Sequence, residues 1–283
     1  MATKYRTMLW AGPVWQPATD FWRKSSTRKW IWKYLFFGWL FDTYEVTFIP
    51  VNKQLQESES VVVPKQIIQD VIRKTSHRAI LPTCLCRVGC RCENHDLGIG
   101  CIFLGEATKQ MHPSLGKPAT VDEALKHLDK AIDNGLIPQI GKVDPDAFWS
   151  GVKMKDWDRF LTLCFCCNCC CIAMRKHQKW DAEIQDKMLK IEGVDIQIED
   201  NCNGCSICAD KCFTKAISID NKKASIDHDL CKLCGICVDH CPRNAISINV
   251  VDEDKMVEVM YGRIKSYGDI IPLDSKLEKV VQQ

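Results

Sequence analysis

The chain has 283 residues, enough for one large domain or two smaller ones, and its formal net charge is +2. So small a charge gives no basis for nucleic-acid binding, and we expect no nucleic-acid partner. The chain also lacks the run of about 18 apolar residues that an ordinary membrane span requires.

Nineteen of its residues are cysteines. In a secreted chain such a count would predict disulfides. Here the count is odd, many cysteines are adjacent or one residue apart, and residues 1–12 lack the apolar stretch of a signal peptide. We therefore expect metal-binding thiolates in a cytoplasmic protein of an anaerobic or low-oxygen setting.

Residues 1–41 are aromatic and basic. They hold six of the nine tryptophans, and seven lysines or arginines against one acid, Asp20. Residues 28–41 are apolar on every side of a helical wheel, which indicates burial against another surface. That surface is a partner subunit, the chain's own core or a membrane interface. We predict a docking segment for a redox partner in a larger complex, with peripheral membrane contact as an alternative.

Residues 42–190 are predicted to be a mainly helical, cysteine-rich domain. Residues 42–63 have an extended, β-rich composition, and a helix begins at Pro64. A second helix spans 120–134, with Thr120 and Glu123 as its capping box. We expect a loop over 136–160 and a polar helix over 172–190. The expected buried faces are Ile67, Ile68, Val71 and Ile72 in the first helix, and Leu125, Leu128 and Ile132 in the second.

Eleven cysteines form two blocks in this region. The first block is Cys84, Cys86, Cys90, Cys92 and Cys101, and the second is Cys164, Cys166, Cys167, Cys169, Cys170 and Cys171. Neither block has the spacing that wraps one cubane, so we expect the two to converge. They would hold two further clusters or one larger cluster, with redox-active thiols or zinc as alternatives.

Four charged or titratable residues lie within or beside the cysteine runs. Arg87 and Arg91 would balance the negative charge of clustered thiolates. His95 is expected to face solvent rather than bind iron, and His240 to tune a neighbouring cluster.

Two further cysteine runs lie near the C-terminus, each with the spacing C-x2-C-x2-C-x3-C. The first three cysteines of such a run reach one cubane, and the fourth reaches the neighbouring one. Zinc sites normally use two separated pairs instead. We assign Cys202, Cys205, Cys208 and Cys241 to one 4Fe-4S cluster, and Cys231, Cys234, Cys237 and Cys212 to a second.

The two runs belong to an internal repeat of 29 residues. The repeat also aligns Ala216–Ile219 with Ala245–Ile248, and these alternating stretches predict short strands. Over residues 195–250 the chain resembles bacterial dicluster ferredoxins. One departure is Phe213, which stands where the second half has Pro242.

A wider resemblance spans residues 44–250. The C-x-C-R pattern at 84–87, Cys101–Gly105 and the C-x-C-C-x-C-C-C run at 164–171 are similar to a poorly characterised group of 4Fe-4S proteins from strict anaerobes. This resemblance implies iron–sulfur binding and electron traffic without a known substrate. The CCG motif of heterodisulfide-reductase catalytic subunits is not present.

The sequence therefore predicts an α+β protein with four parts: a docking segment (1–41), a cysteine-rich domain (42–190), a dicluster ferredoxin-like module (191–250) and a C-terminal tail (251–283) that is charged and wraps the surface. We expect an iron–sulfur electron-transfer subunit of an anaerobic oxidoreductase complex. It would relay low-potential single electrons through two 4Fe-4S clusters and one or two more. No catalytic side chain is assigned. Two alternatives are an enzyme or reductive activator with a cluster in 84–171, and a cluster carrier.

Overall fold

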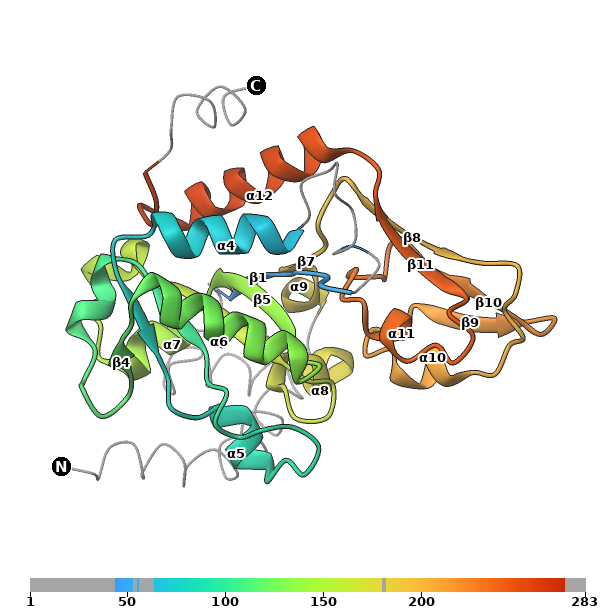
Figure 1. Cartoon of the computed structure of the whole chain (residues 1–283), viewed down its shortest axis with the longest axis horizontal. Coiled ribbons are helices and arrows are strands. Elements are labelled where there is room, and N and C mark those ends of the chain that lie inside the picture. Colours follow the sequence, from blue (N-terminus) through green and yellow to red (C-terminus); the bar gives the residue numbers. More distant parts are fainter. Residues whose placement is uncertain (1–43, 53–54, 56–63, 180–181, 273–283) are drawn as a thin grey trace, which may run out of the picture.

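The computed structural model describes residues 44–52, 55, 64–179 and 182–272 (Figure 1). The predicted docking segment, residues 1–41, lies outside these described residues, as do residues 273–283 of the predicted tail. None of the described helices is long and apolar enough to cross a membrane.

A seven-stranded sheet forms the centre of the larger part of the molecule. Its strand order is β4-β2-β3-β6-β5-β1-β7, and all neighbours are antiparallel except β1 and β7. The strands are β1 (Glu45–Phe48), β2 (Arg78–Ile80), β3 (Ile102–Leu104), β4 (Lys117–Pro118), β5 (Ile137–Lys142), β6 (Leu161–Cys166) and β7 (Met188–Leu189). The mixture of strands and helices confirms the α+β class, whereas the expectation that this region is mainly helical is wrong for its core.

The prediction of a loop over residues 136–160 is wrong. The segment contains β5, then α7 (Asp144–Ser150) and a 3-10 helix, η3 (Met154–Arg159). Strand β5 lies between β1 and β6 and is buried along five of its six residues, so its sequence does not alternate between apolar and polar. Gly141 is required there because a Cβ would approach the carbonyl oxygen of Glu45 to 2.0 Å.

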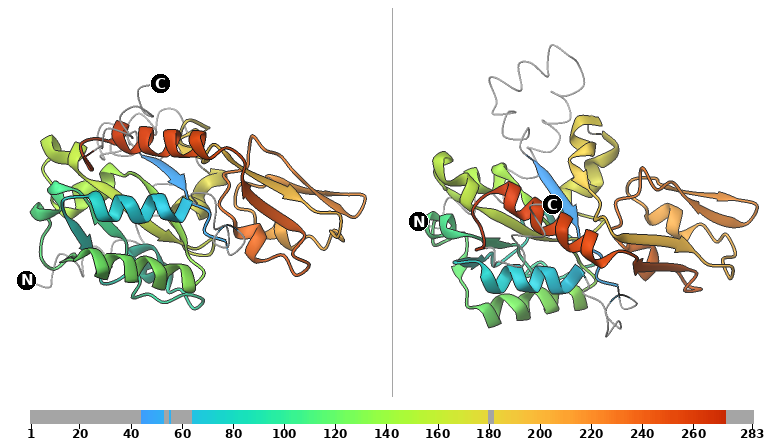
Figure 2. Two further views of the ribbon diagram at one scale, coloured as in Figure 1. Left: turned by 45° about the horizontal axis from the view of Figure 1, so that its top comes forward. Right: turned by 90° about the horizontal axis from the view of Figure 1, so that it is seen from above.

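Three helices cover one face of the sheet. They are α4 (Pro64–Lys74), α6 (Val121–Asp133) and α12 (Glu253–Tyr267), and they lie side by side in the right-hand view of Figure 2. The predicted stripe of α4 is confirmed, since Ile67, Ile68, Val71 and Ile72 are all buried.

The capping box of α6 is confirmed as well, because Glu123 N donates to Thr120 Oγ1 and Thr120 N donates to Glu123 Oε2. The buried face of α6 consists of Ala124, Leu128 and Ala131. Of the three residues predicted, Leu128 is buried, whereas Leu125 and Ile132 are only half-buried, so the buried face is rotated slightly from the predicted one.

The C-terminal segment returns to the large sheet. Met256, Met260 and Ile264 of α12 are buried, and Tyr261 donates from its hydroxyl to Asp70 of α4 at 2.5 Å. We had expected a charged tail that wraps the surface. The apolar face of α12 instead completes the core, because its methionine and isoleucine side chains recur at helical spacing.

The chain between the second cysteine block and the C-terminal module is more broken than expected. The polar helix predicted over 172–190 is divided into α8 (Ile172–Lys176), the 3-10 turn η4 (His177–Lys179) and α9 (Ala182–Asp186), followed by β7. Two short helical elements precede this region, α5 (Leu85–Cys90) and the 3-10 helix η2 (Glu106–Gln110).

A smaller module stands beside the sheet, at the right of Figure 1. It pairs β8 (Val194–Ile198) with β11 (Ile246–Val250), and β9 (Ile217–Asp220) with β10 (Lys223–Ile226). The alternating Ile and Ser residues at 217–219 and 246–248 lie in these strands, as predicted. Two short helices, α10 (Ile207–Lys211) and α11 (Ile236–Asp239), follow the cysteine loops.

Candidate metal centres

The two cysteine loops of the small module have the same backbone. Gly204 and Leu233 occupy equivalent positions with φ of 68° and 51°, and Ser206 and Gly235 follow with 68° and 79°. These left-handed turns favour glycine, and each loop supplies it at a different one of the two positions. The repeat seen in the sequence is therefore a repeat of loop conformation.

The first predicted set of ligands faces one cavity. Cys202, Cys205, Cys208 and Cys241 all line a space of about 320 Å³ between the atoms. Backbone amides point at two of the sulfurs, with Ala224 N 3.5 Å from Cys202 Sγ and Ala245 N 3.2 Å from Cys241 Sγ. The amides of Ala224 and then Gly204 lower the pKa of Cys202, which favours the thiolate that iron requires.

The cysteines of the second predicted set influence one another's charge. Burial raises the pKa of Cys234 to about 12, and the charges of Cys231 and Cys212 raise it further. Burial likewise raises the pKa of Cys237, to which Cys234, Cys231 and Cys212 add. The thiolates of this set therefore repel one another, and they need a positively charged partner to exist together.

Residues 224–247 match the family model of a 4Fe-4S binding domain. The match includes Cys231, Cys234, Cys237 and Cys241, so it covers three predicted ligands of one cluster and one of the other. Comparisons with curated proteins and with solved structures gave no match. A 4Fe-4S binding domain is present, and it indicates electron transfer by iron and sulfur.

The two other cysteine blocks converge, as the sequence predicted. Cys101 Sγ lies 3.2 Å from Cys164 Sγ, and Cys92 Sγ lies 3.7 Å from Cys169 Sγ. The meeting place is the end of β6, where the chain turns toward α8 and passes α5. Their role as ligands stays a prediction.

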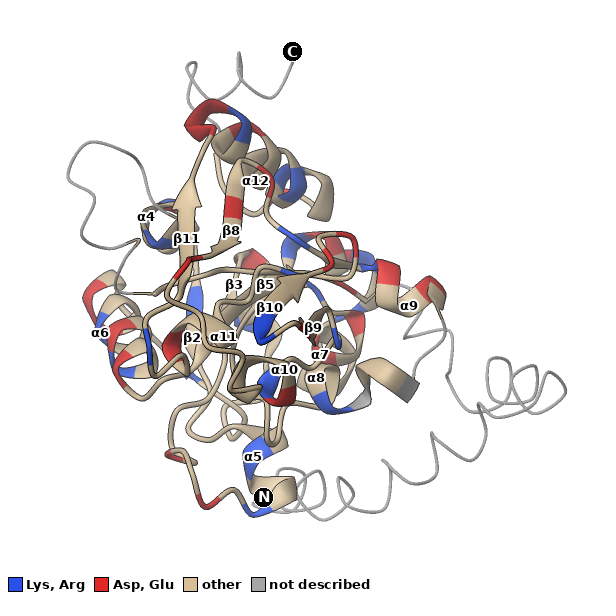
Figure 3. Cartoon of the chain, turned by 90° about the vertical axis from the view of Figure 1, so that its right-hand side faces the viewer, with Lys and Arg blue, Asp and Glu red and all other residues tan. Residues whose placement is uncertain are grey.

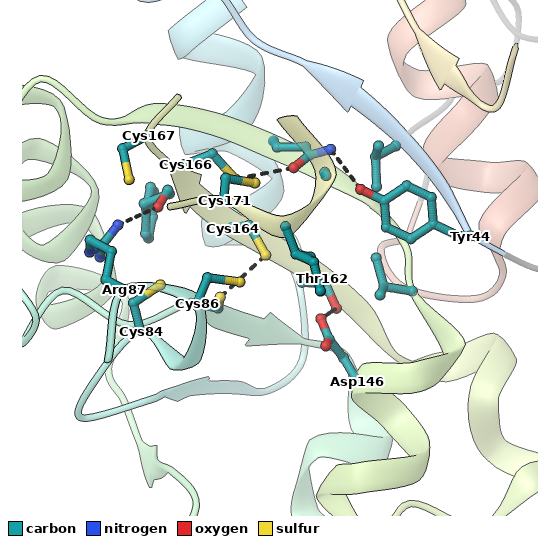
Figure 4. Close-up of a pocket in the computed structure, with 17 residues that line it drawn as sticks. Tyr44, Cys84, Cys86, Arg87, Asp146, Thr162, Cys164, Cys166, Cys167 and Cys171 are labelled. Carbon is teal, nitrogen blue, oxygen red and sulfur yellow. Dashed lines mark hydrogen bonds between the residues drawn. The ribbon is translucent and has the colours of Figure 1, made fainter. Parts of the chain in front are cut away.

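Ten of the eleven cysteines in these two blocks form two separate groups in the structure. Six of them line a cavity beside β6, which encloses about 590 Å³ between atoms, part of it open to solvent (Figure 4). Four others have their sulfurs within 4.8 Å of one another. The cavity group is Cys84, Cys86, Cys101, Cys164, Cys166 and Cys171, and the compact group is Cys92, Cys167, Cys169 and Cys170. Cys167 also borders the cavity, whereas Cys90 belongs to neither group.

Arg87 places a buried cation against the cavity group. Its side chain is fully buried and donates to three backbone carbonyls, those of Phe165 at 2.8 Å, Asp96 at 3.1 Å and Ile99. No carboxylate among the described residues forms an ion pair with it. Burial opposes its charge, but the thiolates of Cys84 and Cys167 raise the pKa of Arg87 above its ordinary value.

This cation fits an anionic centre. A buried charge without a counter-charge is costly, and the nearest source of negative charge is sulfur. The thiol of Cys86 and the charge of Arg87 lower the pKa of Cys84 to about 6, while burial raises it. The residues therefore fit a cluster held by thiolates, with Arg87 offsetting part of its negative charge.

Four polar side chains in the cavity were missed by the sequence analysis. Thr162 Oγ1 donates to Asp146 Oδ2 at 3.1 Å, and burial raises the pKa of Asp146 to about 7. Cys166 Sγ donates to Gln139 Oε1 at 3.2 Å, and Gln139 Nε2 donates to the hydroxyl of Tyr44 at 3.1 Å. No local motif marks these residues, because they come from separate elements of the sheet and α7.

The other singled-out residues have structural partners. His95 was expected to face solvent, but it is half-buried, and its Nδ1 lies 3.0 Å from the carbonyl oxygen of Asn134. His240 Nδ1 lies 2.9 Å from the carbonyl oxygen of Ile236, one turn earlier in the chain. Arg91 is exposed, with φ of 52° at the end of α5. Of the two arginines, only Arg87 reaches the cavity.

The second cysteine set of the small module packs against the sheet region. The ring of Phe213, next to Cys212, lies 5.2 Å from that of Phe48 in β1 and 5.3 Å from His177. Ile236, Cys166 and Cys171 belong to the same apolar cluster, with Cys234 packed against it. Asn52 Nδ2 donates to Gly235 O at 3.1 Å and to Asp239 Oδ1 at 2.6 Å. Phe213, the departure from the repeat, is thus a packing contact between the two parts.

Proposed function

We propose that this protein is the iron–sulfur electron-transfer subunit of an anaerobic oxidoreductase complex. In this proposal it relays single low-potential electrons through two ferredoxin-type 4Fe-4S clusters to a further cluster in the cysteine cavity. The packing of Phe213 on Phe48 supports this most directly. It brings the loop that carries Cys212 against the apolar cluster that contains Cys166 and Cys171, two cysteines of the cavity.

The exposure of the ligands gives the relay a direction. We call the cluster predicted at Cys202, Cys205, Cys208 and Cys241 the outer cluster, and the other the inner cluster. Cys205 is exposed, and Ile207 nearby is 37% exposed. In the other set, none of Cys212, Cys231, Cys234 and Cys237 is exposed. A redox partner can therefore approach the outer cluster closely, whereas protein surrounds the inner one. Hydrogen bonds from Ala224 and Ala245 to sulfur would adjust the potential of the outer cluster.

The partner and the location also belong to this proposal. The aromatic, basic residues 1–41 would dock the chain on a partner subunit in the cytoplasm, directly or near a membrane. Among the described residues, basic and acidic positions alternate along the ribbon when the molecule is viewed from the small-module side (Figure 3). This mixture favours docking by apolar contact over steering by one dominant charge.

Metal and sulfide analysis of the anaerobically purified chain tests the relay. We expect clearly more than about eight irons per chain, the content of two 4Fe-4S clusters, with sulfide also above this level. After dithionite reduction, EPR should show spin coupling among neighbouring clusters. Replacement of a cavity cysteine, Cys101→Ser, should return iron and sulfide to about eight and leave the ferredoxin-type signals unchanged.

Two results would contradict the proposal. A native chain with only eight irons would confine clusters to residues 202–241. Because six cysteines line the cavity and a cubane takes four, the decisive variant replaces Cys84, Cys101 and Cys164 together with serine; if this variant keeps all its iron and sulfide, the cavity group does not hold a cluster.

A second candidate function is an iron–sulfur enzyme or reductive activator. It is favoured by the six cysteines of the cavity, two more than a cubane requires, and by Tyr44, Asp146 and Thr162 beside them. A cluster there with one iron free of cysteine could bind a substrate or act on a partner's cofactor. Cyanide and carbon monoxide are suitable probes of such an iron. If either changes the EPR signal that Cys101→Ser removes, this second function is supported; an unchanged signal leaves the relay as the better account.

A further inference from the structure

The compact group of cysteines differs from all other cysteine sets in this protein. We propose that Cys92, Cys167, Cys169 and Cys170 hold a single tetrahedral metal ion, Zn²⁺ or Fe²⁺, which is separate from the clusters and contains no sulfide. The group does not take part in the relay, so this inference goes beyond the proposed function.

Distance is the first argument. Four sulfurs bound to one tetrahedral ion at about 2.3 Å are about 3.8 Å apart. The sulfurs of Cys92 and Cys169 are 3.7 Å apart, and all four lie within 4.8 Å of one another. The thiolates of a cubane bind four different irons and point outward from its corners, so they must be farther apart than this.

The other cysteine sets of this protein can be compared with the compact group. Among the residues that the structure describes, the predicted ferredoxin-type ligands form no such compact group; one set stands around a cavity of about 320 Å³. The six cysteines of the larger cavity are likewise spread around its wall. The predicted cluster ligands are therefore spread apart, whereas the four sulfurs of the compact group are spaced for a single ion.

The coordination is complete without any outside ligand. Four thiolates satisfy a tetrahedral ion, as in structural zinc sites, which keep no open position. Cys167 and Cys170 are buried, while Cys92 and Cys169 are half-buried, so the ion would be largely enclosed. Arg87 lies close enough for the thiolate of Cys167 to raise its pKa, and it would offset part of the negative charge of the site.

The expected role follows from where the ligands lie in the chain. Cys92 follows α5, whereas the other three lie in the turn after β6, so the ion would connect segments 75 or more residues apart. Such a crosslink stabilises the fold by restricting the unfolded chain and by the free energy of metal binding itself. It would hold the β6–α8 turn beside the larger cavity, which receives Cys166 from the end of β6 and Cys171 from the end of the turn.

Metal analysis of the full-length chain, purified anaerobically, tests this inference. We expect about one Zn²⁺ per chain, or about one iron in excess of the iron matched by acid-labile sulfide, because one ion takes four thiolates. Zinc K-edge absorption should then show sulfur neighbours at about 2.3 Å; if the ion is iron, Mössbauer spectroscopy should show a mononuclear tetrathiolate site. These native measurements do not depend on the folding of any variant.

Variants separate this site from the clusters. Cys92→Ser should lose the single ion while its sulfide content and its EPR signals stay at native levels. Cys90→Ser is the matched control, because Cys90 is nearby and accepts from Arg175 at 2.7 Å but lies outside the compact group; it should retain the ion. The inference is wrong if the native chain has neither zinc nor sulfide-free iron, or if Cys92→Ser loses iron and sulfide in equal amounts. The relay could still hold in either case, since its own test measures Cys101.

Discussion

Replacement of Arg87 by methionine is expected to abolish the cluster that we propose for the cysteine cavity. Methionine fills a similar space, but it removes the three donors to the carbonyls of Phe165, Asp96 and Ile99 and the positive charge beside the thiolates. Unpaired buried carbonyls and an uncompensated anionic site should destabilise the folded chain by at least about 3 kcal/mol. We expect iron and sulfide to fall to the content of the small module, measured together with thermal unfolding.

Two further variants make this prediction specific. Arg91→Met removes a neighbouring but exposed arginine, and it should leave iron content and stability unchanged. Arg87→Lys keeps the charge but lacks the planar guanidinium that donates to three carbonyls. Its iron content and its stability should therefore lie between those of Arg87→Met and the native chain. Native iron content and stability in Arg87→Met would show that the cavity does not need this cation.

Replacement of Phe213 by alanine is expected to weaken the attachment of the small module to the sheet region. The ring is 9% exposed and packs on Phe48 and His177, so truncation should cost about 3 kcal/mol. The iron content should remain native, because none of the predicted ligands is changed. Electrons injected into the ferredoxin-type clusters by flash photoreduction should reach the cavity cluster much more slowly, because its distance from the inner cluster is no longer fixed.

The control is Phe213→Leu, which keeps most of the apolar volume and should cost less than about 1.5 kcal/mol. Electron transfer from the ferredoxin-type clusters to the cavity cluster should stay close to the native rate in this variant. If Phe213→Ala transfers electrons at the native rate while its stability falls, the contact serves folding alone, and the route between the clusters does not cross it.

The two cysteine loops of the small module could be predicted from the sequence because their chemistry is local. Three cysteines at fixed spacing and a fourth close by determine both the residues and the shape of the loop around them. The structure shows the two loops with matching left-handed turns, and it places Cys202, Cys205, Cys208 and Cys241 on one cavity. Helices α4 and α6 were equally accessible to prediction, since proline, a capping box and apolar periodicity are local signals.

The division of the other cysteines was decided by tertiary structure alone. Cys166 and Cys167 are adjacent in the chain, yet one faces the large cavity and the other completes the compact group. Their side chains turn apart at the end of β6. Their partners lie between Cys84 and Cys101, which are separated from β6 in sequence by strands β3, β4 and β5 and by helices α6 and α7. Spacing could predict that the blocks meet, but which sulfur faces which depends on how β3, β5 and β6 pair. That pairing is long-range, and no short stretch of sequence encodes it.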